Sequence, residues 1–400
     1  MPTLAFTDPR RDLTAWANRL AISKEAVEIY AASDVIDLHL DTFIWTRIFG
    51  YDLGKKHGAG LFGRHFYSHC DFPRAMEAGL TGGVWLITTN PFLPAKVRRD
   101  LFFKNLRRFE GEFARYPDVF RIVRTAAQYR AARAAGLHGV FIGVQGGNCL
   151  DHDLTDFDLL DPQHVLRITL VHLSNSSLGT TSSPAARLGG NDGLTNKGRE
   201  YIEVLNAKKI FVDLAHISRR GFFDAVAVHD KTQPLMVTHT GIAGVYEHWR
   251  NITDEQLRAV ADTGGCVGVM FQSGFLAKRN ATVDTVVDHL ERIVNIAGED
   301  VPAHLFQGGG HQLLLGLAFK LAVARLVGVR SFLLLDEPTY GLDRDRRAAL
   351  LSRLADLDVA EQLIVITHHD VVGVSGHRVR VVREGKHSEV RAEQEQGAAP

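Results

Sequence analysis

The chain has 400 residues, of which 45% are hydrophobic and 23% are charged. This composition excludes a disordered or collagen-like chain, and the length predicts roughly two to three domains. The 46 Lys and Arg residues balance the 46 Asp and Glu residues, so no net charge draws the protein towards nucleic acid or an anionic membrane.

Short apolar runs alternate with helical patterns between Asp34 and about Gly298. Seven runs are rich in Val and Ile and nearly continuous in apolar character, as expected of parallel strands buried on both faces. They are residues 35–40, 83–88, 139–144, 167–172, 209–216, 234–239 and 266–271. Between them, segments such as 95–116 and 283–298 have apolar residues at helical spacing. The pattern predicts an α/β fold of the (β/α)8 barrel type, with an open doubly wound sheet as the alternative.

The eighth strand of such a barrel is not recognisable after the helical pattern that ends near Gly298. From residue 301 the sequence changes to a Gly-rich turn and a strongly apolar helical pattern. The segment FLLLDEPTYGLD, a second helical pattern, LIVITHHD and HRVRVVREG follow, and strands are predicted in FLLLDEP and HRVRVVREG. We place a domain boundary near residue 300 and expect residues 391–400 to be a disordered polar tail.

Polar side chains gather where the predicted strands end. His39 and Asp41 end the first strand with one residue between them, so strand alternation puts both side chains on one face. Further strand ends carry His172, Asp213, His216 and His239. A single histidine of this kind is usually a capped or solvated residue, but the carboxyl ends of barrel strands meet on one face, where active sites lie. Imidazoles and a carboxylate together suit Zn²⁺ or a similar divalent ion.

The region from Asp34 to about Gly298 resembles the membrane (renal) dipeptidase family of zinc peptidases. The matching segments, in family order and spacing, are DLHLDT, GVQGGN, ITLVHLSN, GLTNKGREYIEVLNAKKIFVDLAHIS, VTHTG, EHWRNITDEQL and GGCVGVMF. The resemblance implies a (β/α)8 barrel that binds zinc and cleaves the peptide bond of small dipeptides with a metal-activated water.

The resemblance also implies the metal ligands. His39 and Asp41 would bind one zinc ion, and His216 and His239 would bind the other. The family's bridging glutamate is replaced here by Gln145. Because a neutral amide brings no charge to offset the repulsion between two dications, Gln145 predicts either a single-metal site or a weaker second site.

The remaining implied roles concern the substrate. His172 would be the catalytic residue that lies beside the substrate and polarises its carbonyl. Arg250, paired with Asn251, would hold the free carboxylate of the dipeptide, since a guanidinium matches a carboxylate bidentately. For Arg250 alone, an ordinary surface salt bridge is the alternative. The catalytic aspartate of the family's eighth strand has no counterpart here, because the sequence departs from the family pattern just before it.

The last hundred residues resemble a different protein, the C-terminal half of an ABC-type ATPase head of the DNA double-strand-break repair (SMC-like) group. The resemblance assigns the signature, Walker B, D-loop and switch positions to Gln307, Gly308, Gly309, Asp336, Glu337, Asp343 and His368. No GxxxxGK[ST] loop occurs in the chain, so Mg-ATP binding would need an ATPase partner that carries a Walker A loop.

Cysteine usage and hydropathy bear on location. Cys70, Cys149 and Cys266 are widely spaced and form no CxxC pair, which is typical of a reducing compartment. No apolar run reaches the roughly 18 residues of a membrane span, and the first residues lack the apolar segment of a secretory signal. We therefore expect a cytoplasmic protein with no membrane partner.

Three hypotheses about function follow. The first is a metal-dependent dipeptidase with one or two zinc ions, for which a homodimer is one assembly to consider and nucleic acid is not an expected partner of the barrel. The second is an ATPase-related DNA-repair subunit or interaction module. The third is a chimeric chain with little activity, because the barrel lacks an eighth strand and the ATPase lacks its first half.

Overall fold

The computed structural model describes residues 2–57, 70–160, 165–184 and 192–297, together with four short strands at 333–336, 363–366, 378–384 and 387–393. The chain divides into two compact units, Met1–Gln307 and Gly308–Pro400. The division therefore falls close to the boundary predicted near residue 300.

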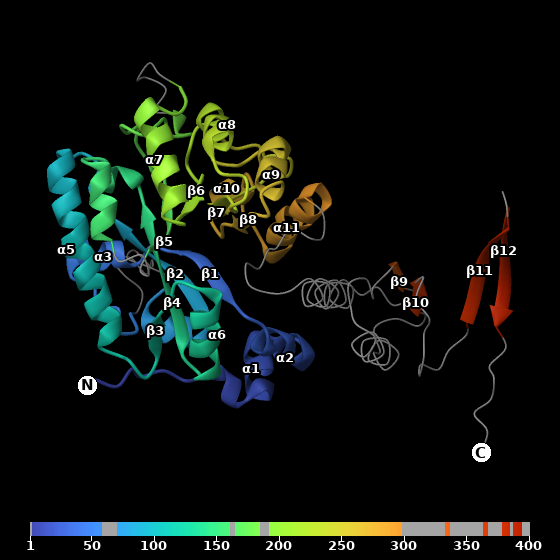
Figure 1. Ribbon diagram of the computed structural model, residues 1–400. Coiled ribbons are helices and arrows are strands. Elements are labelled where there is room, and N and C mark those ends of the chain that lie inside the picture. The colour runs from blue at the N-terminus through green and yellow to red at the C-terminus, as the bar shows by residue number, and fades with distance from the viewer. Residues whose placement is uncertain are drawn as a thin grey trace. The chain divides into compact units, whose positions relative to one another are not determined.

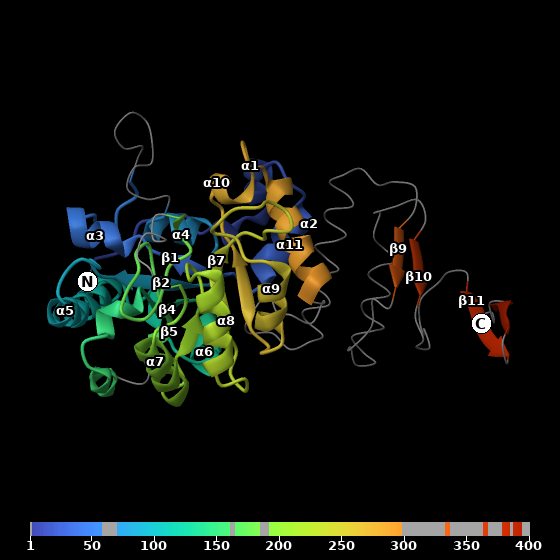
Figure 2. The same ribbon diagram turned by 90° about the horizontal axis from the view of Figure 1, so that it is seen from above.

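The first unit is built on a mostly parallel sheet that curves into a nearly closed barrel (Figures 1 and 2). Seven strands follow one another in the order β1-β2-β4-β5-β6-β7-β8, and β3 pairs with β4 beside them. Their bounds are β1 (Ile36–Leu40), β2 (Gly82–Thr88), β3 (Phe120–Ile122), β4 (His138–Gln145), β5 (Val165–Thr169), β6 (Phe211–Asp213), β7 (Met236–Thr240) and β8 (Cys266–Val269). The sequential order excludes the doubly wound alternative, in which the strand order reverses.

All seven strands predicted for the first unit are confirmed, and among the residues described there only the three-residue β3 has no counterpart in the sequence prediction. No strand takes the eighth barrel place among the residues described in the first unit. The first and last strands nevertheless approach each other. A Cβ on Gly268 of β8 would lie 3.3 Å from Leu38 Cδ1 of β1 and 2.2 Å from the Thr238 carbonyl oxygen, so only glycine fits this position.

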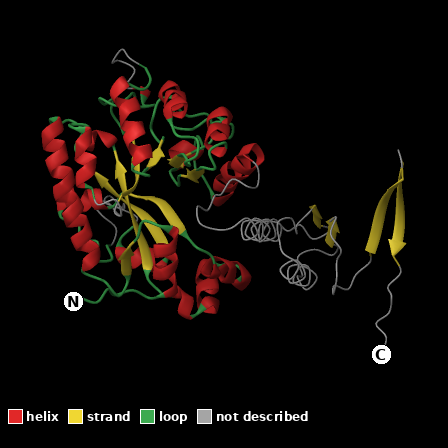
Figure 3. Cartoon of the chain, viewed as in Figure 1, coloured by secondary structure: helices red, strands yellow, loops and turns green. Residues whose placement is uncertain are grey.

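Helices cover the outside of the barrel (Figure 3). Their bounds are α1 (Leu13–Leu20), α2 (Lys24–Ala32), α3 (Phe43–Phe49), α4 (Phe72–Glu77), α5 (Ala95–Ala114), α6 (Ala126–Ala134), α7 (Asn196–Ala207), α8 (Arg219–Val228), α9 (Asp254–Ala261), α10 (Ser273–Leu276) and α11 (Val283–Ala297), with 3₁₀ turns at Pro9–Arg11, Gly147–Leu150 and Leu154–Leu159. The helices predicted over 95–116 and 283–298 are confirmed by α5 and α11. None of the helices within the described ranges combines the length and apolar character needed to cross a bilayer.

An aromatic cluster fixes helices α4 and α5 against the sheet. Phe72 of α4 packs on Trp85 of β2, Phe113 of α5 and Phe120 of β3, with ring centroids 5.4, 4.7 and 4.5 Å apart. All four side chains are buried, and each such pair adds about 0.5–1.5 kcal/mol beyond the burial of its area. The cluster thus anchors both helices on β2 and β3, the two strands that pair with β4.

The residues described in the second unit form two strand pairs. Strands β9 (Leu333–Asp336) and β10 (Leu363–Ile366) are parallel, and β11 (Arg378–Glu384) and β12 (His387–Glu393) are antiparallel. The strands predicted in FLLLDEP and HRVRVVREG are confirmed by β9 and β11, whereas β10 has no counterpart in the sequence prediction. The prediction of a disordered tail over 391–400 is wrong for its first three residues, because they pair with β11 as part of β12.

Candidate active site

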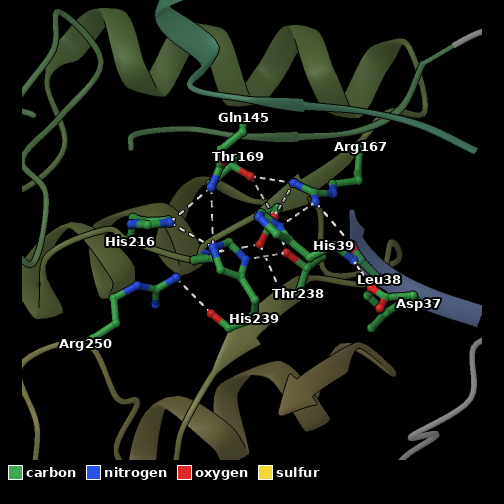
Figure 4. Close-up of polar contacts among 12 residues, drawn as sticks. Asp37, Leu38, His39, Gln145, Arg167, Thr169, His216, Thr238, His239 and Arg250 are labelled. Atoms are coloured by element: carbon green, nitrogen blue, oxygen red, sulfur yellow. Dashed lines mark hydrogen bonds and ion pairs between the residues drawn. The ribbon is translucent and has the colours of Figure 1, made fainter. Parts of the chain in front are cut away.

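Three predicted ligands come together at the carboxyl ends of the barrel strands (Figure 4). Gln145 is the last residue of β4, His239 lies in β7, and His216 follows β6 by three residues. The Nε2 atoms of His216 and His239 lie 2.8 Å apart, and Gln145 Nε2 lies 3.2 and 3.4 Å from them. All three side chains are buried. Residues far apart in the sequence therefore converge on one point, as the barrel interpretation predicts.

The backbone at His216 is held in an unusual conformation. Its φ angle is +70°, in the left-handed region that a residue with a Cβ seldom adopts. The surroundings hold the carbonyl of His216 in place, because Ser182 N donates to it at 2.7 Å and Thr181 Oγ1, shared with the His172 carbonyl, lies 3.0 Å from it. A strained residue that its neighbours fix in this way is typical of a functional position.

The orientation of the His239 ring is set by Thr238 and Asp213. Thr238 Oγ1 donates to Asp213 Oδ2 at 2.7 Å and lies 3.0 Å from His239 Nδ1. Because the hydroxyl has one hydrogen and the carboxylate takes it, the hydroxyl accepts from His239 Nδ1–H. The lone pair of His239 is therefore on Nε2, which faces His216 and Gln145.

The Gln145 side chain is not fully satisfied in this position. Its Oε1 atom is buried without a hydrogen-bond partner, while its Nε2 faces the two imidazoles. Rotation of the amide by 180° would exchange the two atoms and turn the oxygen towards the imidazole nitrogens. Two imidazole nitrogens and an amide oxygen would then face one point, a donor set that a divalent cation accepts.

His39 lies beside this group without joining it. Its ring stacks on the ring of His239, with centroids 3.5 Å apart and planes at 31°. Asp41, the other predicted ligand of the same ion, is exposed. Within the described ranges, no group of three or more His, Cys, Asp or Glu side chains is arranged to hold a metal ion. The arrangement around His216 and His239 consists of two histidines and an amide.

Burial and nearby cations keep the imidazoles neutral. The pKa values of His39, His216 and His239 are held well below the usual range, first by burial and then by neighbours that include the Arg167 and Arg250 guanidinium groups. Neutral imidazole is the form that binds a metal ion.

Two of the predicted substrate residues border this group. The His172 ring meets the His216 ring edge-on, with centroids 4.8 Å apart, and burial followed by the nearby Arg250 lowers the pKa of His172 to about 4. Arg250 is buried, and its Nη2 donates to the carbonyl of His239 at 2.8 Å.

Asn251 serves the adjacent loop. Its Oδ1 accepts from Gly241 N at 3.0 Å, and its Nδ2 donates to the carbonyls of Tyr246 and Phe275 at 2.8 and 2.7 Å. The side chain thus ties together the backbone segments next to Arg250, and both its polar atoms are engaged with backbone groups.

The sequence interpretation missed Arg167, which lies inside the barrel beneath the histidines. It is fully buried in β5, and its Nη1 pairs with Asp213 Oδ2 at 2.7 Å. The available signal was a charged residue within the otherwise apolar run VLRITLVH, two positions before Thr169 and thus on the same face of the strand.

Most of the predicted ATPase residues lie outside the described residues. These are Gln307, Gly308, Gly309, Glu337, Asp343 and His368. Asp336 is the last residue of β9, where it is in register with Ile366 of β10. A likeness to the structure of an SMC ATPase covers 22% of this chain with a TM-score of 0.20 and supports no conclusion. The comparisons do not support ATP binding by this unit.

Proteins of similar sequence include two from bacteria. A Klebsiella pneumoniae protein, described as an uncharacterized protein in the pqqA 5′ region, is 39% identical over 113 residues, which are 27% of this chain and 41% of that protein. An Acinetobacter calcoaceticus protein, described as an uncharacterized protein in the PQQ-III 3′ region, is 25% identical over 252 residues, or 57% of this chain and 79% of that protein. The chain thus spans less than half of the first relative's length.

Solved structures of dipeptidases share the fold. The dipeptidase AC, a metallo peptidase of family M19, superposes with a TM-score of 0.57 and 25% identity over 74% of this chain and 92% of its own. A metallo peptidase from Rhodobacter sphaeroides, bound to a phosphinate mimic of the dipeptide L-Ala-D-Ala, gives a TM-score of 0.57 and 23% identity over 74% and 93%. The model of the membrane dipeptidase family, peptidase family M19, matches residues 23–304. Because this match covers more than half of the chain, the chain belongs to the membrane dipeptidase family.

Proposed function

We propose that the chain is a metal-dependent hydrolase that cleaves the peptide bond of small dipeptides. Membership of a family of metallo-dipeptidases supports the reaction class. The observation that carries the proposal is the pair of buried, neutral imidazoles of His216 and His239, whose Nε2 atoms face each other at 2.8 Å. Zinc is the ion that the family implies and that imidazole ligands favour.

His216 and His239 would hold the ion, with the amide oxygen of Gln145 as a further donor. The fit rests on the Nε2 lone pair of His239 and on the buried Gln145 Oε1 that has no protein partner. When bound, such an ion lowers the pKa of a water molecule and polarises the carbonyl of the scissile bond. The protein supplies the buried ligands and fixes their orientation at the strand ends.

The residues around this group would bind and orient the dipeptide. Arg250 carries a positive charge beside His239 and would pair with the substrate's terminal carboxylate. His172, neutral and edge-on to His216, would donate a ring N–H to the substrate carbonyl oxygen. Asn251 would keep the Arg250 loop in place through its three backbone contacts.

A dipeptide panel with matched histidine variants tests the proposal. The purified chain, loaded with zinc, should hydrolyse dipeptides that have a free C-terminal carboxylate, and His216→Ala should abolish turnover and zinc binding together. His152→Ala, at an exposed histidine outside the site, should change neither. Turnover no faster than that of His216→Ala on every dipeptide would overturn the proposal.

A further inference from the structure

The family resemblance implies a second metal site at His39 and Asp41. The surroundings of His39 differ from those of His216 and His239. His39 Nδ1 lies 3.1 Å from Nη2 of Arg167. A guanidinium has five N–H groups and no acceptor, so it can only donate in this contact. The Nδ1 lone pair of His39 is therefore already occupied.

This hydrogen bond fixes the tautomer of His39. A neutral imidazole has one N–H and one lone pair, so an accepting Nδ1 leaves the hydrogen on Nε2. A nitrogen that carries hydrogen has no lone pair for a metal ion. His239 has the opposite tautomer, because its Nδ1 donates to Thr238 and its Nε2 lone pair faces the site. The two neighbouring rings therefore have opposite tautomers: His239 presents a lone pair on Nε2, and His39 presents an N–H there.

Arg167 is held firmly in this position. Its Nη1 pairs with Asp213 Oδ2 at 2.7 Å and donates to Thr169 Oγ1 at 2.6 Å, and its Nη2 also donates to the carbonyl of Leu38 at 3.2 Å. The neighbouring strand makes room for the guanidinium, since a Cβ on Gly143 would lie 3.1 Å from Arg167 Nε. Displacing Arg167 from His39 would disturb this whole buried network.

The other requirements of a second dication are also missing around His39. Asp41 is exposed, and Asp37 Oδ1 accepts from the backbone N–H of His39 at 2.7 Å. The bridging position is occupied by the neutral Gln145. A fixed positive charge in contact with His39 disfavours a nearby dication, and no bridging carboxylate offsets it.

We propose that Arg167 removes His39 from the set of metal ligands, so that the chain binds one ion, at His216 and His239, rather than two. Arg167 acts as a positioning residue through the tautomer of His39. This inference rests on the proposed function, because it assumes that the His216 and His239 pair binds metal.

Metal stoichiometry separates the two proposals. The 400-residue chain is loaded with excess zinc, desalted and analysed for metal by mass spectrometry. One ion per chain is expected, with affinity lowered at least about 100-fold by His239→Ala and changed less than about threefold by His39→Phe, which keeps a ring against His239. Two ions, one of them lost in His39→Phe, would overturn this inference and leave the hydrolase proposal standing. No bound ion would overturn both.

The tautomer itself provides a readout that is independent of metal and of activity. Long-range ¹H–¹⁵N spectra of the metal-free chain, labelled at histidine and assigned with His39→Phe, should show His39 protonated at Nε2 and His239 protonated at Nδ1. Arg167→Leu should shift the His39 signals towards the other tautomer, whereas Thr169→Val, which alters the same network without touching a histidine, should leave them unchanged. Protonation of His39 at Nδ1 in the unmodified chain would contradict the inference even if Arg167→Leu does not fold.

Discussion

Arg167 and Asp213 form an ion pair of 2.7 Å in which neither side chain is exposed to solvent. The carboxylate also accepts from Thr169 and Thr238, and from the backbone N–H groups of Ala215 and Thr238. One carboxylate thus compensates the buried guanidinium and, through Thr238, sets the tautomer of His239. Asp213 therefore both neutralises a buried charge inside the barrel and orients a candidate metal ligand.

Asp213→Asn should therefore destabilise the protein strongly. The substitution keeps the shape but leaves the Arg167 guanidinium buried without a counter-charge, which costs about 3–5 kcal/mol. Urea unfolding of the variant and of the unmodified chain measures the difference. The double variant Arg167→Leu/Asp213→Leu removes both charges and should recover part of the loss. If Asp213→Asn lowers the free energy of unfolding by less than about 1 kcal/mol, Asp213 does not compensate the buried charge of Arg167.

Gln145→Glu should raise the affinity for zinc. The new carboxylate would face the Nε2 atoms of His216 and His239, now 3.2 and 3.4 Å from the Gln145 amide nitrogen, and would add a negative charge to a neutral donor set. We expect a gain of at least about tenfold, which corresponds to roughly 1.4 kcal/mol. Competition with a chelator of known affinity measures it. Gln145→Leu is the control and should weaken binding, and equal affinities for all three chains would argue against a role for residue 145 at the ion.

His138, which lies away from the candidate active site, should make the free energy of unfolding depend on pH. Its Nε2 accepts from Trp85 Nε1 at 3.2 Å, so its Nδ1 carries the hydrogen and donates to the Leu80 carbonyl at 3.0 Å. Burial lowers the pKa of His138 to about 4, compared with about 6.5 when unfolded. As the pH falls, the unfolded chain binds a proton at this histidine at a higher pH than the folded chain does. The contribution of His138 to the free energy of unfolding is therefore fully present above pH 6.5 and decreases as the pH drops towards 4, by at most about 3 kcal/mol.

Comparison with His138→Phe isolates this contribution from those of the other buried histidines. The difference in the free energy of unfolding between the two chains should change by up to about 3 kcal/mol between pH 7 and pH 4, in favour of the variant on acidification. Denaturant unfolding at several pH values measures it. A difference that stays constant over this range would mean that His138 titrates alike in the folded and unfolded states.

The sequence predicts the barrel well because each strand carries its own signal. The nearly continuous apolar runs at 139–144 and 234–239 need no knowledge of their neighbours to be recognised as buried parallel strands. β3 escapes prediction because three residues, one of them an exposed arginine, form no periodic pattern. The β11–β12 pairing is likewise missed, since the polar segment HSEVRAE looks like a solvated tail until its partner strand is known.

The candidate site could be predicted only in part. The strand-end positions of His216 and His239 follow from the barrel, but the tautomers do not, because they depend on Thr238, Asp213 and Arg167 meeting across strands. The same family pattern that assigns His39 to a metal ion carries no information about the guanidinium that occupies its Nδ1. Contacts between side chains on different strands cannot be predicted from the local sequence around either residue.

Arg250→Lys should weaken the binding of dipeptides more than it slows their turnover. Lysine keeps the positive charge but lacks the fork that pairs with both carboxylate oxygens. Loss of one charge-assisted hydrogen bond costs about 1.5–3 kcal/mol, so KM should rise by roughly 10- to 150-fold while kcat changes little. Steady-state kinetics on a dipeptide with a free C-terminus measures the split. A dipeptide amide, which lacks the carboxylate, is the control substrate and should be hydrolysed equally poorly by both chains.

The pH dependence of KM distinguishes this role from a structural one. Burial lowers the pKa of Arg250 to about 10, so the guanidinium stays charged up to that pH. The same burial would lower a lysine from its usual value of about 10.4 by a comparable amount, so its charge would be lost at mildly alkaline pH. KM of Arg250→Lys should therefore rise between about pH 7 and 9, while KM of the unmodified chain stays flat over that range. Parallel profiles for the two chains would mean that residue 250 does not bind the carboxylate, and that its hydrogen bond to the His239 carbonyl is its main contribution.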